Sequence, residues 1–212
     1  MTSWHWRDAP WASVLVMSDQ EVAREVKGEN EGELMTIAIG QKAPEFCLGT
    51  TKNLDILDHK AKLTDYNGKW LILFFYPMDF TFVCPTEIRG FNLRLSEFAE
   101  LGAEVLGVST DSVFCHRAWI KTPVAEGGLG GLSYPLGADI TKQVSRDYGV
   151  LVEEKGVALR GLFIIDPEGI LRYQVISDLN VGRSIDETLR VLQALQSGGM
   201  CPLEWHLGDQ TL

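Results

Sequence analysis

The sequence has few cysteines, few basic residues and no long apolar run, and each shortage excludes a class of protein. Its four cysteines, Cys47, Cys84, Cys115 and Cys201, form no CxxC pair, which argues against thiol–disulfide exchange of the CxxC type and against a zinc site built on a close ligand pair. With 19 Lys and Arg against 29 Asp and Glu, the chain is a poor candidate for binding nucleic acid, whose phosphates require clustered cations. No apolar stretch approaches the roughly 20 residues that span a bilayer. We therefore expect a soluble protein without a metal site.

The composition changes near residue 35, which predicts an N-terminal extension. Residues before this point include three tryptophans and an acidic stretch, and they are either disordered or precede a true start at Met17 or Met35. The apolar run 11–17 lacks a cationic flank and is short for a signal peptide. Scattered thiols without a secretion signal are typical of a reducing compartment, so the predicted location is cytoplasmic. The predicted regions are an extension over 1–34, a domain over 35–197 and a C-terminal tail over 198–212.

Apolar runs alternate with amphipathic segments from residue 35 onward, which predicts an α/β fold. The near-continuous apolar run 70–76 is typical of a central strand covered on both faces. Residues 85–101 carry apolar side chains at helical spacing, and Asp111 is expected to cap a helix over 112–122. The other expected elements are a loop and short-strand region over 43–68, strands at 104–109, 161–165 and 170–176, and helices near 141–148 and 184–196. The order β-α-β-α-β-β-α indicates a layered α/β architecture.

Cys84 is the cysteine whose local sequence favours reactivity. It follows a strand and a loop and lies at the start of the predicted helix 85–101, next to its first turn. The first N–H groups of a helix have no internal partner and carry partial positive charge, which favours a thiolate over a thiol. Pro85 fits this position, because the first helical residue needs no N–H donor. A lone cysteine at such a junction is more often a buried apolar residue, so the placement alone assigns no role.

The segment around Cys84 resembles the active-site signature of the peroxiredoxins. Pro77, Thr81 and Cys84 reproduce the pattern Pro-x-x-x-Thr-x-x-Cys, and the similarity extends from about Ile39 to Leu212. The best-matching subgroup is that of the typical two-cysteine enzymes, which includes thioredoxin peroxidases and the peroxidase subunit of bacterial alkyl hydroperoxide reductase. The resemblance implies a thiol peroxidase with a thioredoxin-like fold, in which helices flank a central mixed β-sheet.

The resemblance also implies roles for individual residues. Cys84 would attack hydrogen peroxide or an organic hydroperoxide and become a sulfenic acid. Thr81 would hydrogen-bond the thiolate and the peroxide, and Pro77 would shield the site from water. Arg160 would stabilise the thiolate and polarise the peroxide bond, because its guanidinium is always charged and offers several donors. A supporting shell around this arginine and the loop would consist of Glu87, Trp119 and Arg183.

Cys201 lies in the tail, in a segment that resembles the family's resolving motif. The sequence Gly199-Met-Cys-Pro-Leu-Glu-Trp205 matches Val-Cys-Pro-x-x-Trp with Met200 in place of Val. The resemblance implies that Cys201 attacks the oxidised Cys84 of a partner subunit, which gives an intersubunit disulfide in an obligate homodimer. Dimers of this family often assemble into decameric rings. Thioredoxin or a flavoprotein disulfide reductase would restore the thiols, and no bound metal, haem or flavin is required.

Several other interpretations of the sequence remain open. Cys47 and Cys115 match no catalytic position and are interpreted as structural. A metal site joining Cys115 and His116 to His206 is disfavoured, because these residues provide no close ligand pair in one loop. A one-cysteine peroxidase would not need Cys201 for turnover. The activity of a holdase chaperone would survive replacement of Cys84. The activity of a protein disulfide oxidoreductase is disfavoured, because the CxxC motif is missing.

Overall fold

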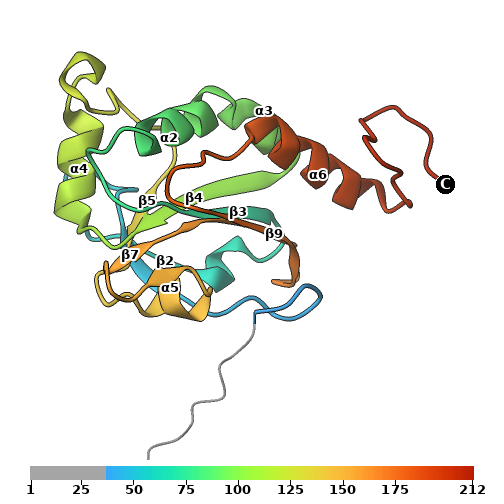
Figure 1. Ribbon diagram of the computed structural model, residues 1–212, viewed down its shortest axis with the longest axis horizontal. Helices are drawn as coiled ribbons and strands as arrows, with labels where there is room; N and C mark the ends of the chain where they lie inside the picture. The colour runs from blue at the N-terminus through green and yellow to red at the C-terminus, as the bar shows by residue number, and fades with distance from the viewer. Residues whose placement is uncertain (1–36) are drawn as a thin grey trace, which may run out of the picture. The chain divides into compact units, whose positions relative to one another are not determined.

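A computed structural model describes residues 37–212, and its central element is a seven-stranded sheet (Figure 1). The extension predicted over 1–34 lies outside the described residues. The strand order is β2-β1-β5-β4-β3-β8-β9, with β4 parallel to both of its neighbours and the remaining pairs antiparallel. The strands are β1 (Cys47–Thr50), β2 (Lys60–Lys62), β3 (Trp70–Phe75), β4 (Ala103–Ser109), β5 (Leu136–Ala138), β8 (Arg160–Ile165) and β9 (Leu171–Ser177). The predicted central mixed sheet is confirmed.

Helices cover both faces of this sheet, with α2, α3 and α6 on one face and α5 on the other (Figure 1). The α-helices are α2 (Cys84–Leu93), α3 (Leu95–Glu100), α4 (Val113–Lys121), α5 (Gln143–Asp147) and α6 (Ile185–Ser197). Two 3-10 turns, η2 (Leu63–Tyr66) and η3 (Val124–Glu126), and a small hairpin of β6 (Leu151–Val152) and β7 (Val157–Ala158) complete the described elements. The predicted α/β class is confirmed.

The apolar run of β3 is explained by two hydrophobic cores, one on each face of the sheet. Successive side chains of a strand point to opposite faces. Phe74 therefore enters the core beneath α2, where its ring stacks on Phe91 at a centroid distance of 4.7 Å. Phe75 enters the other core, where it packs against Tyr148 and Phe163 at 5.3 and 5.7 Å. Because both faces are dry, every residue of β3 after Trp70 is buried.

Two local predictions were wrong in detail. The helix expected over 85–101 is interrupted at Arg94, which leaves helical geometry between α2 and α3 and forms ion pairs with Glu97 and with Asp186 of α6. Asp111 does not cap α4, because its carboxylate accepts hydrogen bonds from other groups of the fold. Ser112 is the N-cap instead, and its hydroxyl accepts from the N–H of Cys115 at 3.2 Å.

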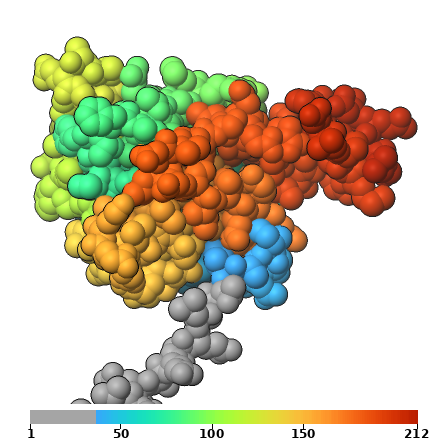
Figure 2. Space-filling view, viewed as in Figure 1, coloured from blue at the N-terminus to red at the C-terminus, as the bar shows by residue number. Residues whose placement is uncertain are grey.

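The chain beyond α6 extends away from the sheet, as the red segment in Figures 1 and 2 shows. Gly198 ends α6 with a φ of 68°, a left-handed conformation that suits glycine. Trp205 is the buried residue of this tail, and its carbonyl accepts from Arg190 of α6 at 3.2 Å. Among residues 37–212, no helix is both long enough and apolar enough to cross a membrane.

Candidate active site

Cys84 is the first residue of α2 and lies on the buried face of this helix. The buried positions of α2 are Cys84, Glu87, Ile88 and Phe91, at the i, i+3, i+4 and i+7 spacing of one helical face. Val83, the N-cap residue, makes no side-chain hydrogen bond to the helix. The free N–H groups and the positive end of the helix dipole therefore remain available to a negative charge at the helix start.

Arg160 brings a buried positive charge to the sulfur of Cys84. It is the first residue of β8, which pairs antiparallel with β3 and so begins beside the strand end that leads into the loop before α2. Its Nη1 lies 3.4 Å from Cys84 Sγ and 2.5 Å from Glu87 Oε2, and its Nε donates to the carbonyl of Leu179 at 2.8 Å. Both Cys84 and Arg160 are almost completely buried, so water screens this contact weakly.

Arg183, in the loop after β9, completes an ion cluster around Glu87. Its Nε and its backbone N–H donate to Glu87 Oε1 at 2.7 and 2.9 Å. Burial by itself raises the pKa of the Glu87 carboxyl, but the hydrogen bonds and charge of Arg183 and the charge of Arg160 more than offset it, so the pKa is lowered. The cluster thus contains two guanidinium groups and one carboxylate. Its single excess positive charge would be balanced by a thiolate at Cys84.

The loop between β3 and α2 holds Pro77 and Thr81 and has a strained backbone. Phe80 has a φ of 54°, a left-handed conformation that is uncommon for a large side chain. Its ring packs on Trp119 of α4 at a centroid distance of 5.9 Å, and the Trp119 Nε1 donates to the carbonyl of Gly127 at 3.0 Å. The hydroxyl of Thr81 donates to the carbonyl of Met78 at 3.0 Å.

The other three cysteines lie apart from this cluster, and all four are free. Cys47 is exposed at the start of β1. Burial, and then the charges of Asp79 and Asp111, raise the pKa of the Cys115 thiol to about 12, so this thiol stays protonated at neutral pH. Cys201 is half-buried in the tail, with its sulfur 3.3 Å from the hydroxyl of Ser197.

Residues 39–174 match the model of the AhpC/TSA family. The chain belongs to this family. It is 57% identical over 174 residues to a putative peroxiredoxin in the rubredoxin operon of Clostridium pasteurianum, a match that covers 82% of this chain and 98% of that protein. It is 54% identical over 178 residues to peroxiredoxin-2 of Bos taurus, covering 82% and 88%. The reduced 2-Cys peroxiredoxin of Plasmodium vivax has a similar structure, with a TM-score of 0.78, 41% identity and coverage of 82% and 91%.

These findings confirm the thioredoxin-like fold and the thiol peroxidase activity that the sequence predicts for this peroxiredoxin. The structure brings four of the predicted site residues into one cluster: Cys84, Glu87, Arg160 and Arg183. Trp119 instead contacts the loop through Phe80, and Cys201 lies in the tail. Asp79 and His116, for which no role in the peroxidase site was predicted from the sequence, are buried and bonded to each other. The available signal was a histidine on the core-facing side of a helix, one turn before Trp119.

Proposed function

We propose that Cys84 is the peroxide-reducing nucleophile of this peroxiredoxin and that Cys201 resolves its oxidised form. The observation that carries the proposal is the contact of Arg160 Nη1 with Cys84 Sγ at 3.4 Å, at the start of a helix. A permanent cation and a helix N-terminus both stabilise a thiolate, and the thiolate is the reactive form of cysteine. Cys115 has the opposite surroundings, since burial and then two nearby carboxylates raise the pKa of its thiol and keep it protonated.

In the first step the Cys84 thiolate attacks one oxygen of the peroxide. The S–O bond forms as the O–O bond breaks, sulfur is oxidised by two electrons, and the leaving alkoxide or hydroxide takes a proton to become an alcohol or water. Arg160 stabilises the negative charge that moves from sulfur to oxygen. The Thr81 hydroxyl can both donate and accept, and it lies three residues before Cys84 in the loop. Pro77, half-buried in the loop after β3, limits access of water.

In the second step Cys201 attacks the sulfenic acid sulfur, which forms a disulfide and releases water. Cys84 is completely buried, so the first turn of α2 has to unwind before another sulfur reaches it. Cys201 lies in a tail whose Met200 and Leu203 side chains are 69% and 92% exposed. Exposed apolar residues beside the resolving cysteine support docking of this tail on a second copy of the chain.

The proposed assembly is therefore a homodimer, with a decamer as the larger form, and a dithiol donor completes the cycle. A related protein self-associates: Plasmodium yoelii Prx1a modified at its N-terminus forms an artifactual octamer. Thioredoxin or a flavoprotein disulfide reductase would transfer two electrons to the disulfide by thiol–disulfide exchange. We place this cycle in the cytoplasm, where such donors are kept reduced.

The test is non-reducing electrophoresis of wild type, Cys84→Ser and Cys201→Ser after one equivalent of hydrogen peroxide, followed by intact mass measurement. We expect a covalent dimer for wild type and none for either variant. Cys115→Ser is the matched control and should still give the dimer. An internal loss of two hydrogens would refute intersubunit resolution, and a stable gain of one oxygen would indicate a one-cysteine enzyme. Wild type that leaves the peroxide unconsumed would contradict the role of Cys84.

A further inference from the structure

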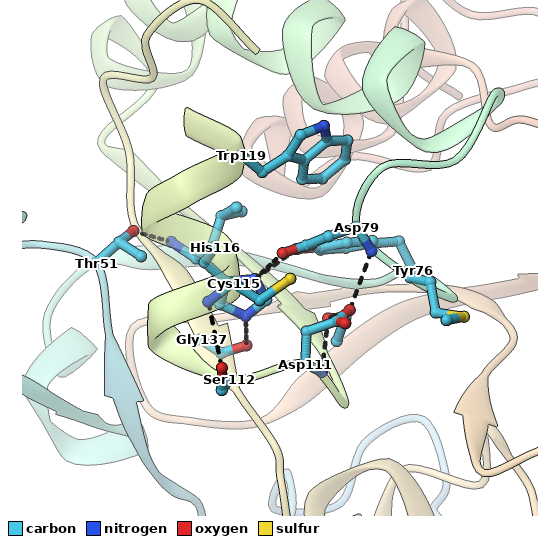
Figure 3. A network of polar contacts seen from close by, with 12 residues as sticks. Thr51, Tyr76, Asp79, Asp111, Ser112, Cys115, His116, Trp119 and Gly137 are labelled. Carbon is cyan, nitrogen blue, oxygen red and sulfur yellow. Dashed lines mark hydrogen bonds and ion pairs between the residues drawn. The ribbon is translucent and has the colours of Figure 1, made fainter. Parts of the chain in front are cut away.

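A buried polar network joins the active-site loop to α4, and Figure 3 shows it. His116, on the inner face of α4, is completely buried, and its Nδ1 lies 2.8 Å from Asp79 Oδ2. The hydroxyl of Tyr76, the residue after β3, donates to the second oxygen of Asp79 at 2.9 Å. The backbone N–H of Asp79 donates to Asp111 Oδ2 at 3.0 Å. Both carboxylate oxygens of Asp79 and its backbone N–H are thus hydrogen-bonded.

The partners of His116 determine how many protons its ring carries. Nε2 lies 3.2 Å from the carbonyl oxygen of Gly137, which can only accept, so Nε2 carries a proton. Nδ1 faces a carboxylate, and one proton must lie between the two groups. Because the Tyr76 hydroxyl already donates to the same carboxyl group, and because a hydrogen bond donated to a carboxylate favours its charged form, the carboxylate form is favoured. The ring is then an imidazolium paired with an anionic Asp79.

The ion pair lies within the segment that the peroxide reaction depends on. Asp79 is followed at once by Phe80, whose left-handed backbone is strained, and then by Thr81. Strained residues persist only where surrounding contacts hold them. His116 holds Asp79, and Trp119, one turn later on the same face of α4, packs on Phe80. One helix face therefore fixes two consecutive residues of the loop.

From this geometry we propose that His116 and Asp79 are positioning residues for the reaction with peroxide. As a buried ion pair, with both ring nitrogens of His116 protonated, they hold the loop 77–83 in the conformation in which Thr81 and Cys84 meet the peroxide together. The inference rests on the proposed role of Cys84. Neither His116 nor Asp79 touches the peroxide, and both act by fixing the backbone conformation of the loop.

The test compares two reactions of Cys84 in the full-length reduced protein. The second-order rate constant for hydrogen peroxide is measured by stopped-flow fluorescence, and alkylation by iodoacetamide is measured by mass spectrometry. Peroxide reduction requires the loop conformation that places Thr81 and Cys84 together at the peroxide. Alkylation requires only an accessible thiolate. For His116→Gln we expect the peroxide rate to fall about 10²-fold, the scale of a misplaced reacting geometry, and alkylation to be at least as fast as in wild type. His59→Gln is the matched control, since His59 bonds only Thr50 in the described residues.

Two further measurements keep the proposal open to refutation if His116→Gln does not fold. Tyr76→Phe removes one hydrogen-bond donor from Asp79 without leaving a charge unpaired, so the variant should fold. Its reaction with peroxide should be about tenfold slower, which corresponds to the loss of one hydrogen bond to a charged group. In wild type labelled with ¹⁵N-histidine, the His116 ring should show protons on both nitrogens at neutral pH, and a bare nitrogen would overturn the ion pair.

The outcomes also separate this inference from the proposed function. A fast peroxide reaction in wild type and an equally fast one in folded His116→Gln and Tyr76→Phe would reject the inference alone. A parallel fall of peroxide and alkylation rates would assign the pair a general structural role and would likewise reject it. If wild-type Cys84 does not react with peroxide at all, the proposed function fails first.

Discussion

Replacing Arg160 by methionine should slow peroxide reduction strongly while leaving the fold intact. The substitution keeps most of the apolar stem and removes the charge beside Cys84. Removing one partner of a buried ion pair is usually strongly destabilising because the other charge is left alone. Here Glu87 keeps the Nε and the backbone N–H of Arg183 at 2.7 and 2.9 Å. The carboxylate therefore stays paired, and the cost in stability should be modest.

The expected loss of rate follows from the distance between the charges. Coulomb's law with an effective dielectric constant of about 20 gives about 5 kcal/mol for a thiolate and a guanidinium 3.4 Å apart. The Glu87 carboxylate, bound to the same Nη1 at 2.5 Å, offsets part of this attraction. A net loss of about 3 kcal/mol corresponds to a rate constant lower by about 10²-fold, since each 1.4 kcal/mol is roughly a factor of ten.

Stopped-flow fluorescence with hydrogen peroxide would measure the rate constant, and urea unfolding would measure stability. Arg146→Met is the matched control, because Arg146 pairs with Glu153 at an exposed position away from the sulfur, and its rate should equal that of wild type. An Arg160→Met protein that is folded and reacts within about threefold of wild type would show that the 3.4 Å contact contributes little to the thiolate, against the screening argument for buried charges.

Three further predictions concern the loop, the ion cluster and the core. Thr81→Val, which keeps the shape and removes the hydroxyl, should lower the peroxide rate constant by about 10²-fold, whereas Thr81→Ser should retain most of it; equal rates for both variants would contradict a role of the hydroxyl. Because folding lowers the pKa of the Glu87 carboxyl from its usual value of 4.5, the ionised carboxylate stabilises the fold at pH values above 4.5. This contribution is lost as the pH falls through the pKa of the folded state. Wild type should therefore exceed Glu87→Gln in urea stability at neutral pH, and the difference should shrink below pH 4.5; a constant difference would contradict the assignment. Gly107→Ala would place a Cβ 2.7 Å from the Phe74 ring in a packed core, so urea unfolding should show a loss of about 1–3 kcal/mol, and an unchanged midpoint would mean that the ring moves freely.

The parts of the fold that were predicted correctly are those with a strong local pattern. The apolar run 70–76 and the amphipathic segment 184–196 became β3 and α6 within one residue at each boundary. Strands β1 and β2 lie in the region 43–68, where only a loop with short strands was predicted, and β5 was not predicted. These strands have three or four residues each, and β5 pairs with segments far away in the sequence. The interruption at Arg94 also depends on distant groups, since its partner Asp186 lies on α6.

The candidate site shows the same division between local and distant information. The position of Cys84 at a helix start could be inferred from its neighbours, because the strand, the loop and Pro85 are contiguous. Arg160 and Arg183 have no local pattern of their own, and only the family resemblance singled them out. Asp79 and His116 were missed because their partnership joins a loop to a helix 37 residues away. The core-facing position of His116 on its helix is a local signal, but it does not identify Asp79 as the partner.

The arginine cluster and the His116–Asp79 pair differ in net charge, and each net charge is consistent with the role of the group beside the loop. The cluster of Arg160, Arg183 and Glu87 has one excess positive charge next to the sulfur, which favours the thiolate. The His116–Asp79 pair is neutral overall, so it can hold the loop without opposing that effect. An aspartate with no cation beside it would bring an uncompensated negative charge into the same loop, at a high desolvation cost. A histidine that donates from both ring nitrogens therefore meets two requirements at once, because it fixes Asp79 and cancels its charge.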